Sequence, residues 1–333
     1  MRPIADPVAR AFINRFQGGF PITDRPFSNV AAEIGIGESA LIQCVRTLLQ
    51  RMILSRFGPL YDAEAMGGRS LLAALSVPGH RFDEVADLLN GMPEVAHNYA
   101  RDHAFNMWFV IASDDQRSVD ATLDRIGRLS GLEVLALPKL REFKIGLWIH
   151  LACDGSVDTV PLPAHALPPE PFAHPGPDAI DRRLIHATQA GLPLVPRPYH
   201  QLAADLELSP DIVMDRFRKL WAGRIIRRIG AVPHHYRLGL RGNGMTVWEV
   251  PAERIEAAGR RLAASPWVSH CYQRPSRGRH WPYTLFAMVH GQDRRAVEEK
   301  TRALARLPEL RGVAYEILFS TRVLKKAGLR IAA

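Results

Sequence analysis

Hydrophobic positions follow a helical spacing in some segments of the chain and a strand spacing in others. Residues 8–16 and 27–35 have short helical patterns, the second ending at Gly35, and residues 53–58 have the pattern of a short strand. The apolar stripe of a longer helix at residues 38–52 contains Ala40, Leu41, Cys44, Val45, Leu48 and Leu49. Three helices with a tight turn between the second and third, followed by a wing, predict a winged helix-turn-helix.

The next part of the chain alternates apolar strands with amphipathic helices. Strand, helix, strand, strand, helix and strand are predicted, in that order, for residues 70–77, 81–90, 94–101, 105–112, 116–129 and 132–138. This is the β-α-β-β-α-β order of a ferredoxin-like unit. Such a unit covers one face of its sheet with helices and leaves the other face bare.

The whole arrangement occurs twice. Residues 6–58 align without a gap to residues 178–230 at an offset of 172, and 15 of the 53 aligned positions are identical. The offset grows to 173 at Tyr99 and Tyr272, and further along the chain it becomes larger as the second copy gains residues. The chain is therefore predicted to contain two copies of one unit.

The repeat predicts an α+β fold with five parts. These are a winged helix-turn-helix at 1–66, a ferredoxin-like domain at 67–150, a Pro-rich linker at 151–177, a second winged helix-turn-helix at 178–241 and a second ferredoxin-like domain at 242–333. Packing the two bare sheet faces against each other buries both, so we expect the two sheets to pack as an internal pseudo-dimer. Whether two chains also form a homodimer stays open.

Composition indicates a globular protein. Of the 333 residues, 47% are hydrophobic and 23% are charged, which is typical of a folded soluble chain. No apolar run approaches the roughly 20 residues of a membrane span, and the start lacks the apolar core of a signal peptide, so a cytoplasmic protein without a membrane partner is expected. Cys44, Cys153 and Cys271 are scattered and are expected to be reduced thiols.

Charge is divided unevenly between the two copies. Residues 1–170 carry a net charge of −4, whereas residues 171–333 carry +13. A basic half suggests an anionic partner such as a nucleic acid, a membrane surface or a polycarboxylate. Charge alone does not choose among these.

Two strand segments carry the candidate chemistry. In the first copy Val95, His97, Tyr99 and Arg101 alternate with their neighbours and are predicted to share one face of a strand. The equivalent set in the second copy is Val268, His270, Tyr272 and Arg274. Polar strand faces are common on solvated sheets, but here the trio recurs at corresponding positions of a repeat. Two such faces that meet are expected to form one cationic, aromatic cleft.

Longer motifs surround both faces and resemble a known family. The tandem of helix-turn-helix and ferredoxin-like units resembles the Lrp/AsnC regulators in fold. The segments AHNYARDHAFNMWF at 96–109, CYQRPSRGRHWPYTLFAMVHG at 271–291 and LFSTRVLKK at 318–326 are more specifically similar to the siroheme decarboxylases of haem d1 biosynthesis. That family has paired Lrp-like subunits, separate or fused, and the resemblance covers almost the whole chain. It implies conversion of the C12 and C18 acetate side chains of siroheme to methyl groups, giving 12,18-didecarboxysiroheme.

The resemblance implies a site that binds a flat macrocycle with eight carboxylates. Arginine donors and aromatic walls suit such a ligand. The substrate-binding candidates are Tyr99, Arg101, Trp108, Tyr272, Arg274, Arg277, Arg279, Trp281, Tyr283 and Arg322. Trp108 is compatible with core packing as well as with a ligand wall.

Decarboxylation needs a proton donor, because the carbon that loses carbon dioxide must be protonated. Imidazoles suit that role near neutral pH. The catalytic candidates are His97, His103, His270 and His280, of which His97 and His103 are preferred because they lie in the less basic copy. One of the four could instead be a ligand of the siroheme iron, and each could be structural. The macrocycle itself is the electron sink, so no cofactor beyond the iron tetrapyrrole substrate and no metal of the protein's own is expected.

Two other functions compete with this hypothesis. A helix-turn-helix suggests a DNA-binding regulator, but residues 38–51 contain one acid and only two bases, and the two candidate recognition helices differ strongly in charge. DNA is therefore not an expected partner. A non-catalytic tetrapyrrole sensor would share the cleft without releasing carbon dioxide. For the enzyme, siroheme and other haem d1 biosynthesis proteins are the implied partners.

Overall fold

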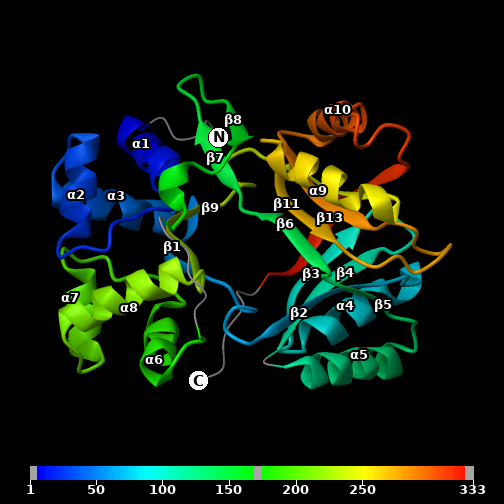
Figure 1. The fold of residues 1–333 in the computed structure, drawn as a ribbon, viewed down its shortest axis with the longest axis horizontal. Helices are drawn as coiled ribbons and strands as arrows, with labels where there is room; N and C mark the ends of the chain where they lie inside the picture. Colours follow the sequence, from blue (N-terminus) through cyan, green and yellow to red (C-terminus); the bar gives the residue numbers. More distant parts are fainter. Residues whose placement is uncertain (1–5, 114, 169–174, 327–333) are drawn as a thin grey trace.

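The computed structural model describes residues 6–113, 115–168 and 175–326, and it separates the helical units from the sheets. The helical units of both copies lie together on one side, and the sheet-containing units lie on the other (Figure 1). Within the described residues, no helix is both long and apolar enough to cross a membrane. The two copies therefore meet in two places: helical unit against helical unit, and sheet unit against sheet unit.

The first helical unit contains α1 (Pro7–Arg15), α2 (Pro26–Ile34) and α3 (Glu38–Gln50), followed by the strand β1 (Leu54–Tyr61). As predicted, α2 ends at Gly35, whose φ of 80° is the left-handed conformation that glycine adopts readily.

The second unit repeats this order with α6 (Ala179–Thr188), α7 (Pro198–Asp205), α8 (Pro210–Ala222) and β9 (Ile226–Pro233). Asp178 caps α6 by accepting a hydrogen bond from the backbone of Asp181.

The predicted wing strands pair across the two copies. Strands β1 and β9 form a two-stranded antiparallel sheet in which Gly58 lies opposite Gly230, its own counterpart in the repeat. Gly58 has a φ of 142°, and a Cβ there would lie 2.6 Å from the backbone nitrogen of Leu192, so glycine is required. Phe57 of the first copy and Phe217 of the second belong to one shared apolar core. The two helical units therefore fold as one body around a local two-fold axis.

Both ferredoxin-like units form as predicted. The first contains β2 (Arg69–Leu75), α4 (Phe82–Asn90), β3 (Val95–Arg101), β4 (Met107–Ser113), α5 (Gln116–Ser130) and β5 (Leu135–Pro138). The second contains β10 (Gly242–Trp248), α9 (Ile255–Ala264), β11 (Val268–Gln273), β12 (Leu285–Gly291), α10 (Arg294–Ala305) and β13 (Tyr315–Lys326). Short 3-10 turns precede α4 and α9 at Gly79–Arg81 and Ala252–Arg254.

The copies exchange strands, which the sequence pattern did not predict. A nine-stranded antiparallel sheet runs in the order β5-β2-β4-β3-β13-β10-β12-β11-β6, where β6 is Arg141–Ile145. Strand β6 follows β5 in the first copy but pairs with β11 of the second. Strand β13 pairs first with β10 of its own copy and then, from Ser320 onward, with β3 of the other. Each copy thus completes the edge of its partner's sheet.

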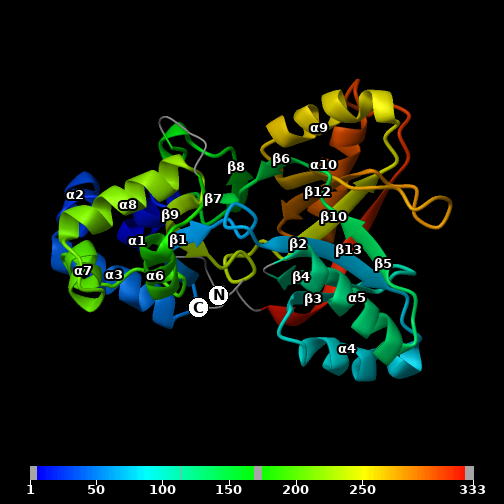
Figure 2. The same ribbon diagram turned by 60° about the horizontal axis from the view of Figure 1, so that its bottom comes forward.

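The two sheets face each other with their helices outside. Helices α4 and α5 cover one sheet and α9 and α10 cover the other (Figures 1 and 2). The inner faces share an apolar cluster from both copies, which includes Trp108, Leu137, Trp281, Phe286 and Leu318. Burial on both sides explains why these strands have nearly continuous apolar sequences. The predicted packing of the bare sheet faces as a pseudo-dimer is confirmed.

The connection between the copies contains regular structure. Strands β7 (Trp148–Leu151) and β8 (Val157–Val160) form a hairpin, and a 3-10 turn follows at Ala164–Ala166. Gln17 fixes the hairpin to the first helical unit by donating to the carbonyl of Ile149 at 2.6 Å. Most of the predicted linker 151–177 therefore lies in or beside ordered elements, while residues 169–174 lie outside the described residues.

Strand exchange predicts a sharp difference between two helical glycines. A Cβ at Gly259 of α9 would lie 2.4 Å from the ring of Phe143 on β6, whereas the nearest atom at Gly127 of α5 would be 3.8 Å away. Gly127→Ala should stabilise the protein by up to about 1 kcal/mol through helix propensity. Gly259→Ala should destabilise it by about 1–3 kcal/mol, because it displaces β6. Denaturant unfolding measures both, and equal effects of the two substitutions would contradict this account of the β6 contact.

Candidate functional site

The strands that carry the His-Tyr-Arg sets both contain a bulge. The pairing of β3 with β4 shifts register between Val95 and His97, and that of β11 with β12 shifts between Val268 and His270. An extra residue moves the following side chains to the opposite face. Val95 and Val268 therefore pack beneath the helices, and the prediction that they share a face with the polar residues is wrong.

Arg101, the last residue of its set, is a buried cation that forms no ion pair within the described part of the chain. Arg101 is only 9% exposed to solvent. Its Nη1 donates to the carbonyl of Leu318 in the other copy at 2.6 Å. The guanidinium lies 5.9 Å from the ring centre of Tyr99. Its Nε has no hydrogen-bond partner among the described residues, and burial lowers the pKa of Arg101 to about 10. A buried guanidinium in this state favours an anionic ligand.

Arg274 occupies the equivalent position in the second copy. Its Nη1 donates to the carbonyl of Leu137, which is the counterpart of Leu318. The guanidinium lies 5.3 Å from the ring centre of Tyr272, and its Nε likewise has no partner in the described part of the chain. Burial lowers the pKa of Arg274 to about 10. The repeat therefore places two like arginines, each bonded across the interface.

The two faces do not form the single cleft that we expected. Three strands, β13, β10 and β12, separate β3 from β11 in the joined sheet. Tyr236 of the second copy influences the pKa values of Tyr99 and Arg101, whereas Glu64 of the first copy influences that of Arg274. The pseudo-dimer thus has two separate sites related by the local two-fold axis.

A second polar group joins the copies near the end of β3. His103 Nε2 lies 3.2 Å from one carboxylate oxygen of Glu316, and the Tyr283 hydroxyl donates to the other at 2.6 Å. His103 Nδ1 accepts from the backbone of Phe105, which fixes the ring. Burial raises the pKa of Tyr283, and Glu316 raises it further, so the phenol stays protonated. This His-Glu-Tyr group can hold and deliver a proton.

Both predicted tryptophans are buried in the apolar cluster between the sheets. Trp281 is fully buried, with its ring 5.2 Å from that of Trp108 and 5.7 Å from that of His103. Trp108 donates its Nε1 hydrogen to the carbonyl of Phe105. These rings hold the copies together and support His103 from behind.

His270 lies in a buried polar cluster. Ser269 Oγ is 2.8 Å from His270 Nδ1 and 2.6 Å from Nε2 of His290, whose ring contacts His235. Burial lowers the pKa of His270 to about 4 and that of His290 well below its ordinary value. Both imidazoles are therefore neutral at pH 7 and are poor proton donors.

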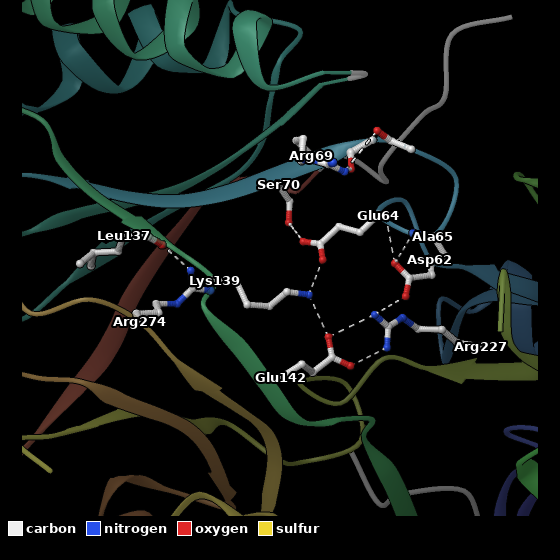
Figure 3. A network of polar contacts seen from close by, with 12 residues as sticks. Asp62, Glu64, Ala65, Arg69, Ser70, Leu137, Lys139, Glu142, Arg227 and Arg274 are labelled. Carbon is white, nitrogen blue, oxygen red and sulfur yellow. Dashed lines mark hydrogen bonds and ion pairs between the residues drawn. The ribbon is translucent and has the colours of Figure 1, made fainter. Parts of the chain in front are cut away.

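A charged network fills the space beside Arg274 (Figure 3). Lys139 lies 2.5 Å from Glu64 and 3.0 Å from Glu142. Arg227 lies 2.7 Å from Asp62 and 2.9 Å from Glu142. Burial alone would raise the pKa of Glu142, but Arg227 and Lys139 outweigh it and hold that pKa below its ordinary value. Burial lowers the pKa of Lys139, but its two carboxylate partners reverse the effect and raise it.

Several predicted residues lie elsewhere. Arg277 donates to the carbonyl of Ala136, while Arg279 and His280 are exposed on the loop between β11 and β12. Arg322 pairs with Asp83 of α4 on the helix-covered side of the sheet. The structure does not bring these four side chains to the His97-Tyr99-Arg101 face.

A hollow of about 450 Å³ lies between the helical side and the second sheet. Its lining residues come from the turn before β10, the β7–β8 hairpin and the end of β12: Gly155, Val157, His234, Tyr236, Arg237, Leu238, Gly239, Arg241 and Gln292. Tyr236 lines the hollow and also lies near enough to Arg101 to raise the pKa of its guanidinium. Sites for small ligands commonly have volumes of roughly 300–1,000 Å³. Nowhere in the described ranges do three or more His, Cys, Asp or Glu residues form a metal site.

Sequence reasoning missed Tyr236, Glu316 and the five residues of the charged network. Their pairing depends on strand exchange and on the turns after β1 and β9, neither of which leaves a local pattern. Comparing the two copies position by position would have shown that the network has no charged counterpart.

The fold defines a class of tandem AsnC-like proteins. Models of an AsnC-like ligand binding domain match residues 65–144 and 237–325, and those of a siroheme decarboxylase NirDL-like helix-turn-helix domain match residues 9–54 and 181–227. The chain belongs to the siroheme decarboxylase family, whose members are carboxy-lyases.

Relatives and a solved structure support this assignment. The siroheme decarboxylase NirDL subunit of Paracoccus denitrificans is 36% identical over 98% of both chains. The siroheme decarboxylase NirH subunit of Paracoccus pantotrophus is 50% identical over 46% of this chain and 96% of that subunit. The crystal structure of the siroheme decarboxylase NirDL with an iron-uroporphyrin III analogue has a TM-score of 0.69 and 29% identity, covering 96% of this chain and 92% of that one.

The half-buried His270 predicts loss of stability in mild acid. Its pKa falls from the ordinary 6.5 to about 4 on folding, so between these values the unfolded state binds more protons. The free energy of unfolding should therefore decrease as the pH falls from 6.5 to 4, by up to about 3 kcal/mol for this group. Denaturant unfolding at pH 7.5 and 5 measures the decrease. His270→Gln should reduce it, whereas the exposed His186→Gln should leave it unchanged; a decrease insensitive to His270→Gln would refute the assignment.

Proposed function

We propose that the protein is a siroheme decarboxylase that converts the C12 and C18 acetate side chains to methyl groups, giving 12,18-didecarboxysiroheme. In each step the bond between the acetate methylene and its carboxylate breaks. Carbon dioxide leaves, the electron pair passes into the macrocycle, and a proton from the protein joins the methylene carbon. The family relationship supports the reaction, and the analogue bound in the related crystal structure supports the class of substrate.

The observation that carries the proposal is the buried, unneutralised Arg101. Its pKa of about 10 keeps it charged at pH 7, and no Asp or Glu among the described residues contributes to that pKa. A substrate carboxylate would supply the missing charge and a partner for the free Nε. Tyr99 and His97 lie on the same face of β3 as Arg101. The Tyr99 ring and the His97 imidazole would therefore contact the ligand that Arg101 binds. His97 and His103 are the candidate ligands of the siroheme iron.

His103 is the proton donor in this proposal. Glu316 lies 3.2 Å from Nε2 and orients it, while the hydroxyl of Tyr283 holds Glu316. His270 is unsuitable because it is neutral at pH 7. The chemistry uses the macrocycle as its electron sink, so no separate organic cofactor takes part.

The helix-turn-helix units serve as scaffold in this proposal. The basic side chains of α8 are already engaged: Arg216 pairs with Asp178, Arg218 donates to the carbonyl of Ile22, and Lys219 pairs with Asp215. Few cations therefore remain on this helix for phosphate contacts.

Anaerobic incubation of the purified protein with siroheme tests the activity. Mass analysis of the tetrapyrrole should show the loss of two carbon dioxide molecules and a product with two fewer carboxyl groups. Unchanged siroheme that stays bound would indicate a sensor or carrier. Siroheme that neither binds nor reacts would leave DNA-binding regulation as the better hypothesis.

His103→Gln tests the proton donor. The substitution should leave siroheme affinity within about threefold but lower turnover by about 100-fold or more, because acid catalysis commonly contributes 10²–10⁴. Single-turnover kinetics separates binding from the chemical step. The matched variant is His280→Gln, since His280 is the repeat counterpart and is exposed. Turnover lost in His280→Gln and retained in His103→Gln would reverse the assignment.

A further inference from the structure

The local two-fold axis allows the two sites to be compared residue by residue. Tyr99 pairs with Val323 on the neighbouring strand, and Tyr272 pairs with Glu142, so Val323 and Glu142 are equivalent. Residues directly opposite in antiparallel strands share a face, which places each beside the arginine of its site. The offset of 172 relates the turns that follow β1 and β9 in the same way.

No member of the charged network has an Asp, Glu, Lys or Arg as its counterpart. In the order Asp62, Glu64, Lys139, Glu142 and Arg227, the equivalent residues are His234, Tyr236, Ser320, Val323 and Ser55. The residues that bind to these positions differ between the copies as well. The Ser70 hydroxyl donates to Glu64, and its counterpart Asn243 donates to the hydroxyl of Tyr236, the counterpart of Glu64. The same scaffold thus holds carboxylates at one site and side chains without a carboxylate at the other.

The two buried arginines consequently have opposite electrostatic surroundings. Around Arg274 there are three carboxylates and two further cations, so the group as a whole is neutral. Around Arg101 the ionisable groups that influence its pKa are Tyr99 and Tyr236, and no carboxylate of the described residues balances the guanidinium. A polycarboxylate ligand is attracted to the Arg101 site. The fixed carboxylates of the Arg274 site repel it.

The hollow adjoins the uncompensated site. Arg237 and Arg241 line it, both are exposed, and neither forms an ion pair within the described residues. Tyr236 belongs both to this hollow and to the surroundings of Arg101. Free cations at the mouth would attract and orient the carboxylates of an incoming ligand.

We infer that the chain binds one polycarboxylate tetrapyrrole, at the Arg101 site, and that Glu64 and Glu142 with their cations close the Arg274 site. The inference rests on the proposed function for the class of ligand. In effect, protein carboxylates occupy the Arg274 site in place of substrate carboxylates. Lys139 and Arg227 are engaged there and unavailable to a ligand.

Titration with iron uroporphyrin III, followed by absorbance, tests the inference independently of turnover. The wild-type chain should bind one equivalent. Arg101→Leu should weaken binding at least tenfold, and the matched variant Arg274→Leu should change it less than threefold. Two bound equivalents, no binding to the wild type, or loss of binding only in Arg274→Leu would overturn the inference. One equivalent bound at Arg101 without siroheme decarboxylation would contradict the proposed function alone.

A second pair of variants avoids disturbing either buried arginine. Val323 is 44% exposed, so substitutions there should be compatible with folding. Val323→Glu introduces beside Arg101 the carboxylate that Glu142 provides at the other site, and it should weaken analogue binding at least tenfold. Val323→Gln has the same size without the charge and should stay within threefold of wild type. Equal affinities of the two variants would overturn the electrostatic account.

Discussion

The exchange of edge strands between the copies is the constraint on which the rest of the structure depends. Because β6 joins β11 and the end of β13 joins β3, neither sheet is complete without the other copy. Leu137 and Leu318 lie just before these crossings, still paired within their own sheets, and their carbonyls accept from Arg274 and Arg101 of the other copy. Burying a guanidinium is costly unless its donors are satisfied, so these crossings also make the two arginine positions possible.

Much of the fold followed from the sequence because helix and strand periodicities are local. The two α-β repeats, the glycine end of α2 and the packing of the bare sheet faces were all predictable from spacing and repetition. The bulges before His97 and His270 were not, since an extra residue leaves the alternation of apolar and polar positions nearly unchanged. Strand exchange also escaped prediction, because pairing partners far apart in the chain have no local signature.

The candidate site was predictable only in its residue types. The His-Tyr-Arg sets do lie on the inner faces, and the structure gives Arg101 and His103 surroundings that suit anion binding and proton transfer. The proposed wall residues Trp108 and Trp281 are packed in the core, because large aromatic residues fill the space between sheets as readily as they stack on a ligand. Glu316 and Tyr236 depend on contacts between copies that residue spacing does not encode.

The covalent tandem has a consequence for how such a site evolves. In a symmetric homodimer one codon specifies both equivalent positions, so a carboxylate that blocks one cavity also blocks the other. Two copies within one chain mutate separately, and position 142 can hold glutamate while position 323 holds valine. A symmetric homodimer has either two identical open pockets or two blocked ones. A tandem chain can keep one pocket open and block the other.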